Sequence, residues 1–367
     1  MWRRIFVGVA VAIAIAFGMG VGRGIVDQVA ARVLSGPERQ RALEWRQCYG
    51  PDAAIANAGC SARGADEHER PEHRAAAYMQ RARAQPEDAA ARISDYSLAA
   101  ELDANNAYAY AYRAEARLTV GDVEEAAVDL QRAMTLKPGD FHIRYFEGIL
   151  WFERGEYQRA AARFQDLLDD LDIAETRREE AVRHAGFEPS SEDPTSFDSD
   201  TWIVKLNMLR ATSLYSVGET ALAVQLRDRA LALDPHAGAE MEVLCGNRLR
   251  TSVNLDAVLA ACDAAIAFFP VEMSHRVNHG VAALRDGDAR RALADFENVL
   301  GSAPNVEGAA LTIEAAMARY NVALALYGRG LARRQLNLSG GDQDLIAATL
   351  LSADAPGFYQ HFRLRPS

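Results

Sequence analysis

The stretch "NNAYAYAYRAEA", Asn105–Ala116, fits two kinds of secondary structure, and the fold of the chain depends on which of the two it adopts. Alanine and tyrosine alternate from Ala107 to Tyr112, which is the two-residue period of a half-buried strand, and tyrosine favours strands. Alanine, however, is the strongest helix former. A strand would place the tyrosines on one face, whereas a helix would distribute them over several. The pattern of the rest of the chain decides between the two.

A comparison of the sequence with itself reveals a repeat of about 34 residues. A glycine followed by an acidic residue stands at Gly121 and again at Gly155, and other residues keep the same step. The positions one step apart are Tyr96, Leu130 and Phe164; Ala99 and Ala133; and, at 35 and 34 residues, Pro235, Pro270 and Pro304. Gly218 and Gly287 occupy the same place in their own units. Each unit has an alanine-rich amphipathic run, a glycine-acid break, a second run and a proline or polar stop. This is the pattern of a helical hairpin repeated in series.

These units resemble tetratricopeptide (TPR) repeats, whose pattern is W-x2-L-G-x2-Y, then A-x3-F, then P. In the copy that matches best, Tyr110 takes the Trp position and Pro138 the final position, with Arg113, Ala114, Ala126 and Leu130 between them. Later copies contribute Gly148, Ala160, Phe164, Ala211, Ala223, Pro235, Gly280, Ala292, Phe296 and Pro304. Small residues recur at the positions where two helices cross closely. The resemblance covers most of the chain from Gln47 onward and implies about eight hairpins.

The resemblance implies an all-α fold, a right-handed superhelical solenoid of TPR-like hairpins, and this solenoid is expected to follow an N-terminal membrane helix. In this register Tyr110 packs in the interior, while Tyr108 and Tyr112 turn to another face. The segment "FEPSSEDPTSFDSD" fits no repeat and predicts an acidic surface loop. The expected domains are a signal-anchor or signal peptide (1–24), a helical linker (25–46), an N-terminal TPR-like block (47–171), a polar helix and acidic loop (172–200) and a C-terminal TPR-like block (201–367).

The N-terminus is expected to enter a membrane. Two arginines precede an uncharged apolar run, Ile5–Val21, which has about the length of a membrane-spanning helix. Two fates are open: a signal peptide cleaved near Ala14–Ala16, or an uncleaved anchor, which the length of the run favours. Residues 5–21 would then contact the lipid bilayer of the inner membrane, with the repeats in the periplasm. The alternative is a soluble periplasmic protein. The strong preference for Arg over Lys indicates a bacterial source.

The four cysteines form two similarly placed pairs, Cys48 with Cys60 and Cys245 with Cys262. Each pair would bridge the two helices of one hairpin. In an exported protein, oxidising conditions favour a disulfide within each pair. The alternative is buried free thiols that act as small apolar residues. A metal site is not expected, because neither pair has the C-x2-C spacing of a zinc site.

Several classes of function receive no support. A net charge of −11 argues against a nucleic-acid partner, which needs a basic surface. His275 and His279 share a helical face, but no third ligand accompanies them, so both are interpreted as helix-surface residues. No phosphate-binding glycine loop or G-x-S-x-G motif is present. We therefore expect a protein that is not an enzyme, with no catalytic residues, no metal and no cofactor.

In arrays of this kind the concave groove, lined mainly by first helices, commonly holds a peptide or a partner helix. The candidate partner-binding residues are Tyr108, Tyr112, Tyr145, Phe146, Ile149, Phe152, Met208 and Tyr215. Exposed aromatic side chains would suit an apolar or proline-containing peptide. Packing of these side chains between neighbouring repeats is an equally open alternative.

The expected function is a non-catalytic scaffold of the bacterial cell envelope that binds unidentified proteins or peptides through a tyrosine-rich concave groove. One alternative is a periplasmic carrier of a peptide or small ligand. A remote alternative is a hydrolase or transferase that uses the array to position its substrate.

Overall fold

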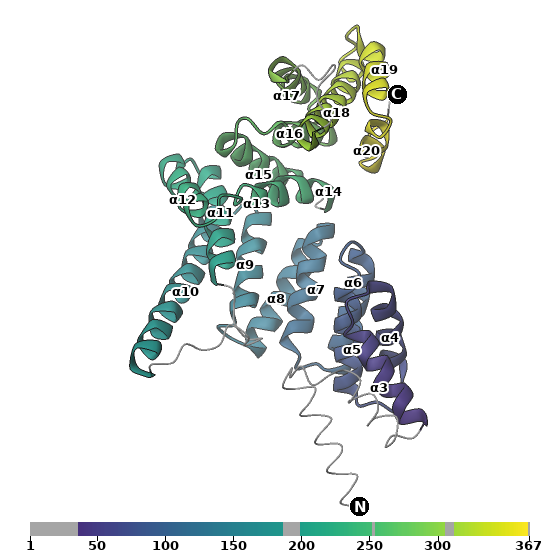
Figure 1. The fold of residues 1–367 in the computed structure, drawn as a ribbon, viewed down its shortest axis with the longest axis vertical. Coiled ribbons are helices and arrows are strands. Elements are labelled where there is room, and N and C mark those ends of the chain that lie inside the picture. The colour runs from purple at the N-terminus through teal and green to yellow at the C-terminus, as the bar shows by residue number, and fades with distance from the viewer. Residues whose placement is uncertain (1–35, 186–198, 252–253, 305–311, 366–367) are drawn as a thin grey trace, which may run out of the picture. The chain divides into compact units, whose positions relative to one another are not determined.

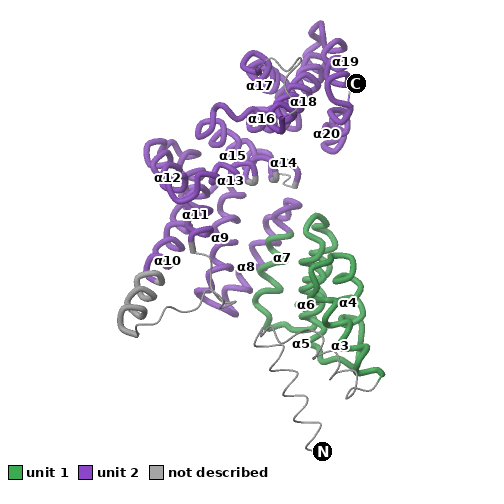
Figure 2. Tube along the Cα trace, viewed as in Figure 1, with its two compact units in different colours: residues 1–116 green, residues 117–367 purple. Residues whose placement is uncertain are grey.

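The computed structural model describes residues 36–185, 199–251, 254–304 and 312–365, and within these ranges the regular secondary structure is entirely helical. The chain divides into two compact units, one up to Ala116 and one from Arg117 onward (Figure 2). The division falls inside a helix. Each unit is described by itself.

The described helices follow one another as eight helix–turn–helix segments, and the boundary between the two units falls within the third of them (Figure 1). They are α3 (Gly36–Cys48) and α4 (Ala53–Ala65); α5 (Pro71–Arg83) and α6 (Ala89–Leu102); α7 (Ala107–Val120) and α8 (Val123–Leu136); α9 (Phe141–Glu153) and α10 (Tyr157–Ala185); α11 (Ser199–Ser216) and α12 (Thr220–Leu233); α13 (Ala239–Glu242), η1 (Val243–Asn247) and α14 (Arg248–Thr251) with α15 (Leu255–Phe268); α16 (Met273–Asp286) and α17 (Ala289–Ser302); and α18 (Ile313–Gln335) and α19 (Gly341–Leu351). A short helix, α20 (Ala355–His361), follows them.

The stretch of alternating alanine and tyrosine is a helix, α7, as the 34-residue register predicts. Ala109, Ala111 and Ala114 are fully buried, so small side chains line the faces on which other helices approach closely. Tyr108, Tyr110 and Tyr112 are all partly buried. Tyr110 is therefore less enclosed than its place at the Trp position of the repeat implies.

The glycine of each glycine-acid break is a turn residue. Gly121, Gly155, Gly218 and Gly287 all have positive φ, between 73° and 87°. This left-handed conformation ends the first helix of a hairpin, and a residue with a Cβ would be strained there. The recurrence of glycine at this step of the repeat follows from that backbone requirement.

Small residues lie where the two helices of a hairpin cross, as predicted. A Cβ added to Gly148 would lie 2.5 Å from Cε1 of Phe164, and one added to Gly280 would lie 2.8 Å from the Phe296 ring. Phe164 and Phe296 are themselves fully buried. The glycine thus makes room for the second-helix aromatic residue that holds the hairpin together.

The predicted insert at 172–200 begins inside a regular helix, because α10 continues without interruption from Tyr157 to Ala185. The acidic loop itself falls mainly on 186–198, which lies outside the described residues. The hairpin that follows α12 departs from the others. Its first helix is broken into α13, the π-helical turn η1 and α14.

The structure contradicts the prediction that the chain lies at the inner membrane with its repeats in the periplasm. Within 36–185, 199–251, 254–304 and 312–365, no helix has both the length and the apolar character needed to cross a bilayer. The apolar run at 5–21 lies outside the described residues. The membrane location is not retained.

Candidate partner-binding surfaces

In the first unit, Tyr108 and Tyr112 lie side by side on α7. Their ring centroids are 6.3 Å apart, and Tyr112 stacks on the buried Tyr96 of α6 at 5.8 Å. The guanidinium of Arg83 lies 5.1 Å from the centre of the Tyr112 ring. Tyr112 therefore packs between helices on one side and keeps a partly exposed edge on the other. Tyr108 extends the same aromatic face, which we call the tyrosine face.

In the second unit, the candidates on α9 differ in exposure. Tyr145 and Phe146 are each 9% exposed, and Phe152 is 1% exposed. Phe152 packs against Tyr157 and below the guanidinium of Arg248, so its ring is part of the interior. Ile149 is partly exposed. On this helix the packing alternative therefore accounts for Phe152, while Ile149 remains accessible.

The candidates on α11 also divide. Met208 is fully buried, so its side chain is not accessible to a partner in this structure. Tyr215 is partly buried and meets the Phe268 ring edge-on at 5.6 Å. Arg227 of α12 donates a hydrogen bond to the Phe268 carbonyl oxygen of α15 at 3.2 Å. This hydrogen bond holds α12 and α15 together beside Tyr215.

An aromatic cluster that the sequence analysis did not single out lies where α9 meets α11. Trp202 meets the rings of Phe141, His142 and Tyr145 at centroid distances of 5.1, 5.6 and 5.0 Å. Nζ of Lys205 lies 5.3 Å from the Trp202 ring centre. Phe141, His142 and Trp202 remain partly exposed. We call these five residues the Trp202 cluster.

Two first helices build the Trp202 cluster. Phe141 and Tyr145 are one helical turn apart at the start of α9, and Trp202 and Lys205 are three residues apart on α11. Asp140 caps α9 by accepting hydrogen bonds from the backbone N–H groups of His142 and Ile143, which fixes where the helix begins. An i, i+4 search of α9 gives Phe141 and Tyr145, but it gives no sign of Trp202, which directly follows the acidic segment that interrupts the repeat.

Charged side chains also join the two helices of several hairpins in the interior. In four described hairpins, a buried aspartate directly precedes the second-helix packing residue and bonds a basic side chain of the first helix. The pairs are Arg81–Asp95, Arg117–Asp129, His279–Asp295 and Arg329–Asp344. In α9 and α10 the polarity is reversed, with Glu147 2.9 Å from Arg163. These pairs form a second repeated element that supports the hairpins.

The prediction that His275 and His279 are surface residues is wrong, because each is 3% exposed. Nδ1 of His279 is 2.6 Å from Oδ2 of Asp295, and Nε2 makes an ion-pair contact of 3.2 Å with Oδ1 of Asp263. Burial alone would lower the pKa of His279, but the hydrogen bonds and charges of Asp263 and Asp295 outweigh it and raise that pKa to about 9. Both ring nitrogens face carboxylates, which leaves neither positioned to accept a proton from a substrate.

His275 has a different environment. Burial lowers its pKa, and the nearby Glu242 and Glu272 act in the opposite direction. Glu242 also accepts hydrogen bonds from the Ser274 hydroxyl and the Asn278 amide, at 3.0 and 3.3 Å. Its carboxylate thus ties the break in the first helix, just before η1, to α16.

The structure contains a disulfide within each predicted pair. Cys48 is bonded to Cys60 and Cys245 to Cys262, and each bond links the first and second helix of its hairpin. All four cysteines are buried. Cys245 lies in η1, so the second disulfide fixes the irregular first helix to α15. In the part of the chain that the structure describes, no three His, Cys, Asp or Glu side chains are grouped so that they could hold a metal ion.

The hairpins, their turn glycines and their crossing positions define the class of the protein: a TPR-like helical repeat protein. No family model matches the sequence, and no curated protein matches it. Among solved structures the chain is similar to PilW, a type IV pilus biogenesis factor, at 16% identity and a TM-score of 0.38, over 66% of this chain and 97% of PilW.

Two further similar structures are described as TPR proteins, as the sequence predicts. One is YrrB, a TPR protein with an unusual peptide-binding site, at 19% identity and a TM-score of 0.30, over 57% of this chain and 93% of YrrB. The other, from Parabacteroides merdae, is 14% identical with a TM-score of 0.34, over 79% of this chain and 98% of its own length. These identities and TM-scores are low, so the likeness concerns the fold alone and carries no argument about function.

Proposed function

We propose that this chain is a non-catalytic scaffold that binds an apolar or proline-containing segment of a partner protein through aromatic side chains on its first helices. In this proposal the tyrosine face of the first unit and the Trp202 cluster of the second are the contact surfaces. The concave, tyrosine-rich groove predicted from the sequence remains part of the proposal. Of the predicted residues, Tyr108, Tyr112, Ile149 and Tyr215 are partly exposed, whereas Tyr145, Phe146, Phe152 and Met208 are buried.

The observation that carries the proposal is the partial exposure of the Trp202 cluster. Trp202 already packs edge-on against Tyr145, so its ring is held in place before a partner arrives. A preorganised aromatic side chain offers a large contact area at a low cost in conformational entropy. Lys205 adds a positive charge beside these rings, which favours a segment that carries an acidic residue next to its apolar ones.

Site-specific photocrosslinking in the native cell tests this function. A photoreactive phenylalanine analogue replaces Trp202 in one variant and Trp151 in a matched control. Trp151 is also a partly exposed tryptophan, but it packs against Arg159 at 3.6 Å and lies outside the cluster. We expect a discrete protein adduct from position 202 that is absent from position 151. Equal labelling from both positions, or no adduct from position 202, would count against the scaffold.

A further inference from the structure

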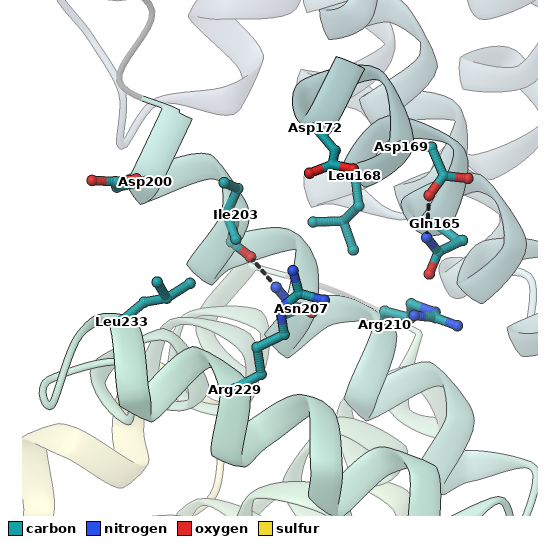
Figure 3. A pocket seen from close by; sticks show the side chains of 10 residues that line it. All are labelled: Gln165, Leu168, Asp169, Asp172, Asp200, Ile203, Asn207, Arg210, Arg229 and Leu233. Carbon is teal, nitrogen blue, oxygen red and sulfur yellow. Dashed lines mark hydrogen bonds between the residues drawn. The ribbon is translucent and has the colours of Figure 1, made fainter. Parts of the chain in front are cut away.

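A pocket of about 270 Å³ lies in the second unit where α10, α11 and α12 meet (Figure 3). It is outside both the tyrosine face and the Trp202 cluster. The part contributed by α11 is one helical face, since Asp200, Ile203, Asn207 and Arg210 recur at intervals of three and four residues. Its volume falls just below the range of about 300–1,000 Å³ that is usual for drug-sized ligands, so a small ligand fits best.

The pocket wall contains a buried polar group with an unsatisfied atom. Asn207 is 1% exposed, and its Nδ2 donates a hydrogen bond to the carbonyl oxygen of Ile203 at 2.8 Å. Its Oδ1 is buried and accepts no hydrogen bond from the described residues. An orphaned buried acceptor costs about 1–3 kcal/mol, so it is retained most readily where a bound molecule supplies the missing N–H donor.

Two arginines and the carboxylate of Asp169 line the pocket. Arg210 and Arg229 line it, and neither forms an ion pair with any described residue. The pKa of Arg210 is lowered, first by burial and further by the positive charge of Arg229, while Asp169 acts in the opposite direction. Arg210 is thus influenced by both the positive charge of Arg229 and the negative charge of Asp169, and the effect of Asp169 is the larger of the two. A carboxylate placed between the two guanidinium groups could accept paired hydrogen bonds from them.

The other end of the pocket is acidic. Asp172 and Asp200 lie on the side away from the two arginines, with the aliphatic side chains of Leu168 and Ile203 between the ends, while the third aspartate, Asp169, lies nearer Arg210 (Figure 3). A simple anion would gain from the arginines but would be repelled by these aspartates, as a simple cation would be by the arginines. A molecule that carries both charges, separated by a short apolar or amide linkage, complements both ends.

We propose that this pocket binds a zwitterion, either a free α-amino acid or a short peptide with free termini. The carboxylate lies between Arg210 and Arg229, the ammonium group faces Asp172 and Asp200, and an N–H of the ligand donates to Oδ1 of Asn207. The site is independent of the scaffold function, because its residues do not belong to either aromatic surface.

Calorimetric titration of the full chain with leucine, dileucine and trileucine tests the proposal. Which of the three binds shows whether the ligand is a free amino acid or a short peptide. For that ligand, acetylation of the amino end or amidation of the carboxyl end should each weaken binding at least tenfold. These comparisons use the unaltered protein. Absence of binding by all three zwitterions, or equal binding of the amidated form, would overturn the proposal.

Variants give a second readout. The double substitution Arg210→Gln with Arg229→Gln should weaken binding at least tenfold, whereas Arg290→Gln, an exposed arginine on α17, should leave it unchanged. Asn207→Leu replaces the orphaned amide with an apolar side chain of similar size, so it should weaken binding without lowering the melting temperature. Unchanged affinity in the double variant would contradict the site.

Discussion

Nδ1 of His279 lies 2.6 Å from Oδ2 of Asp295, and this contact joins α16 to α17 in the interior of the second unit. The other ring nitrogen faces Asp263 of α15, so one imidazolium links three helices. Because the two carboxylates raise the pKa of His279 to about 9, the ring stays charged at neutral pH. The charged ring is thus a structural element and not a switch at neutral pH.

This contact predicts a loss of stability at alkaline pH. A histidine whose folded pKa is raised contributes its full stabilisation below the unfolded pKa of 6.5 and loses it as pH rises through about 9. The difference between these values corresponds to at most about 3 kcal/mol. The free energy of unfolding, measured by urea denaturation, should therefore fall between pH 6.5 and 9 in the native chain.

The histidine variants isolate this effect. His279→Gln should remove most of the decline between pH 6.5 and 9, whatever its effect on stability at pH 7. His275→Gln should retain the decline, because the lowered pKa of His275 keeps that ring neutral throughout the window. An identical slope in the native chain and in the His279 variant would refute the assignment.

The interior pair Arg117–Asp129 should matter much more than a surface pair. Asp129 is 2% exposed, so Asp129→Ala removes the ion-pair partner of the partly buried Arg117, which among the described residues keeps only its hydrogen bond to the Glu125 carbonyl oxygen, and should cost about 3 kcal/mol. Glu156→Ala removes the partner of Arg159 in an exposed pair and should cost less than about 1 kcal/mol. Equal costs in denaturant titrations would show that the interior pair is not a supporting element.

Gly148 should resist even the smallest side chain. Gly148→Ala places a methyl group against the Phe164 ring, and we expect a net destabilisation of about 1–3 kcal/mol despite the higher helix propensity of alanine. Gly301 on α17 has open space around its Cβ position, so Gly301→Ala should be neutral or slightly stabilising. If both substitutions stabilise the chain, the result would contradict the close approach of the helices at Gly148.

The disulfides should each add about 3 kcal/mol, because they close loops of 12 and 17 residues. Alkylation of the denatured chain without reductant should modify no cysteine, and four should react after reduction. The double substitution Cys245→Ala with Cys262→Ala should lower the midpoint of urea denaturation. Four reactive thiols without reductant would exclude both bonds.

The sequence was sufficient to predict features that depend on the backbone or on one hairpin. The step between Gly121 and Gly155 locates successive turns, because each turn needs a left-handed residue. The same register resolves Ala107–Tyr112 as helix and places Gly148 against Phe164. In each case the interacting residues belong to the same repeat, so their spacing along the chain reveals the contact.

Features that depend on several helices could not be predicted. His279 forms ion pairs with Asp263 and Asp295, which belong to two other helices. The i, i+4 spacing of His275 and His279 gives no sign of these two partners. Met208 is fully buried. Its burial was not predicted, because the repeat register identifies a first helix but not how deeply the neighbouring helices cover each of its sides. Trp202 was missed because it follows the segment where the register is interrupted. A search for the aspartate that precedes each packing residue could have found the interior ion pairs.

The most direct test of the scaffold is the affinity of the chain for the partner segment identified by crosslinking at position 202. We expect Trp202→Ala to raise the dissociation constant about tenfold or more, since aromatic anchors dominate such contacts. Trp151→Ala, with a comparable loss of aromatic surface, should change it less than about twofold. Melting temperatures of both variants verify that they are folded. Unchanged affinity in a folded Trp202→Ala variant would contradict the proposed function.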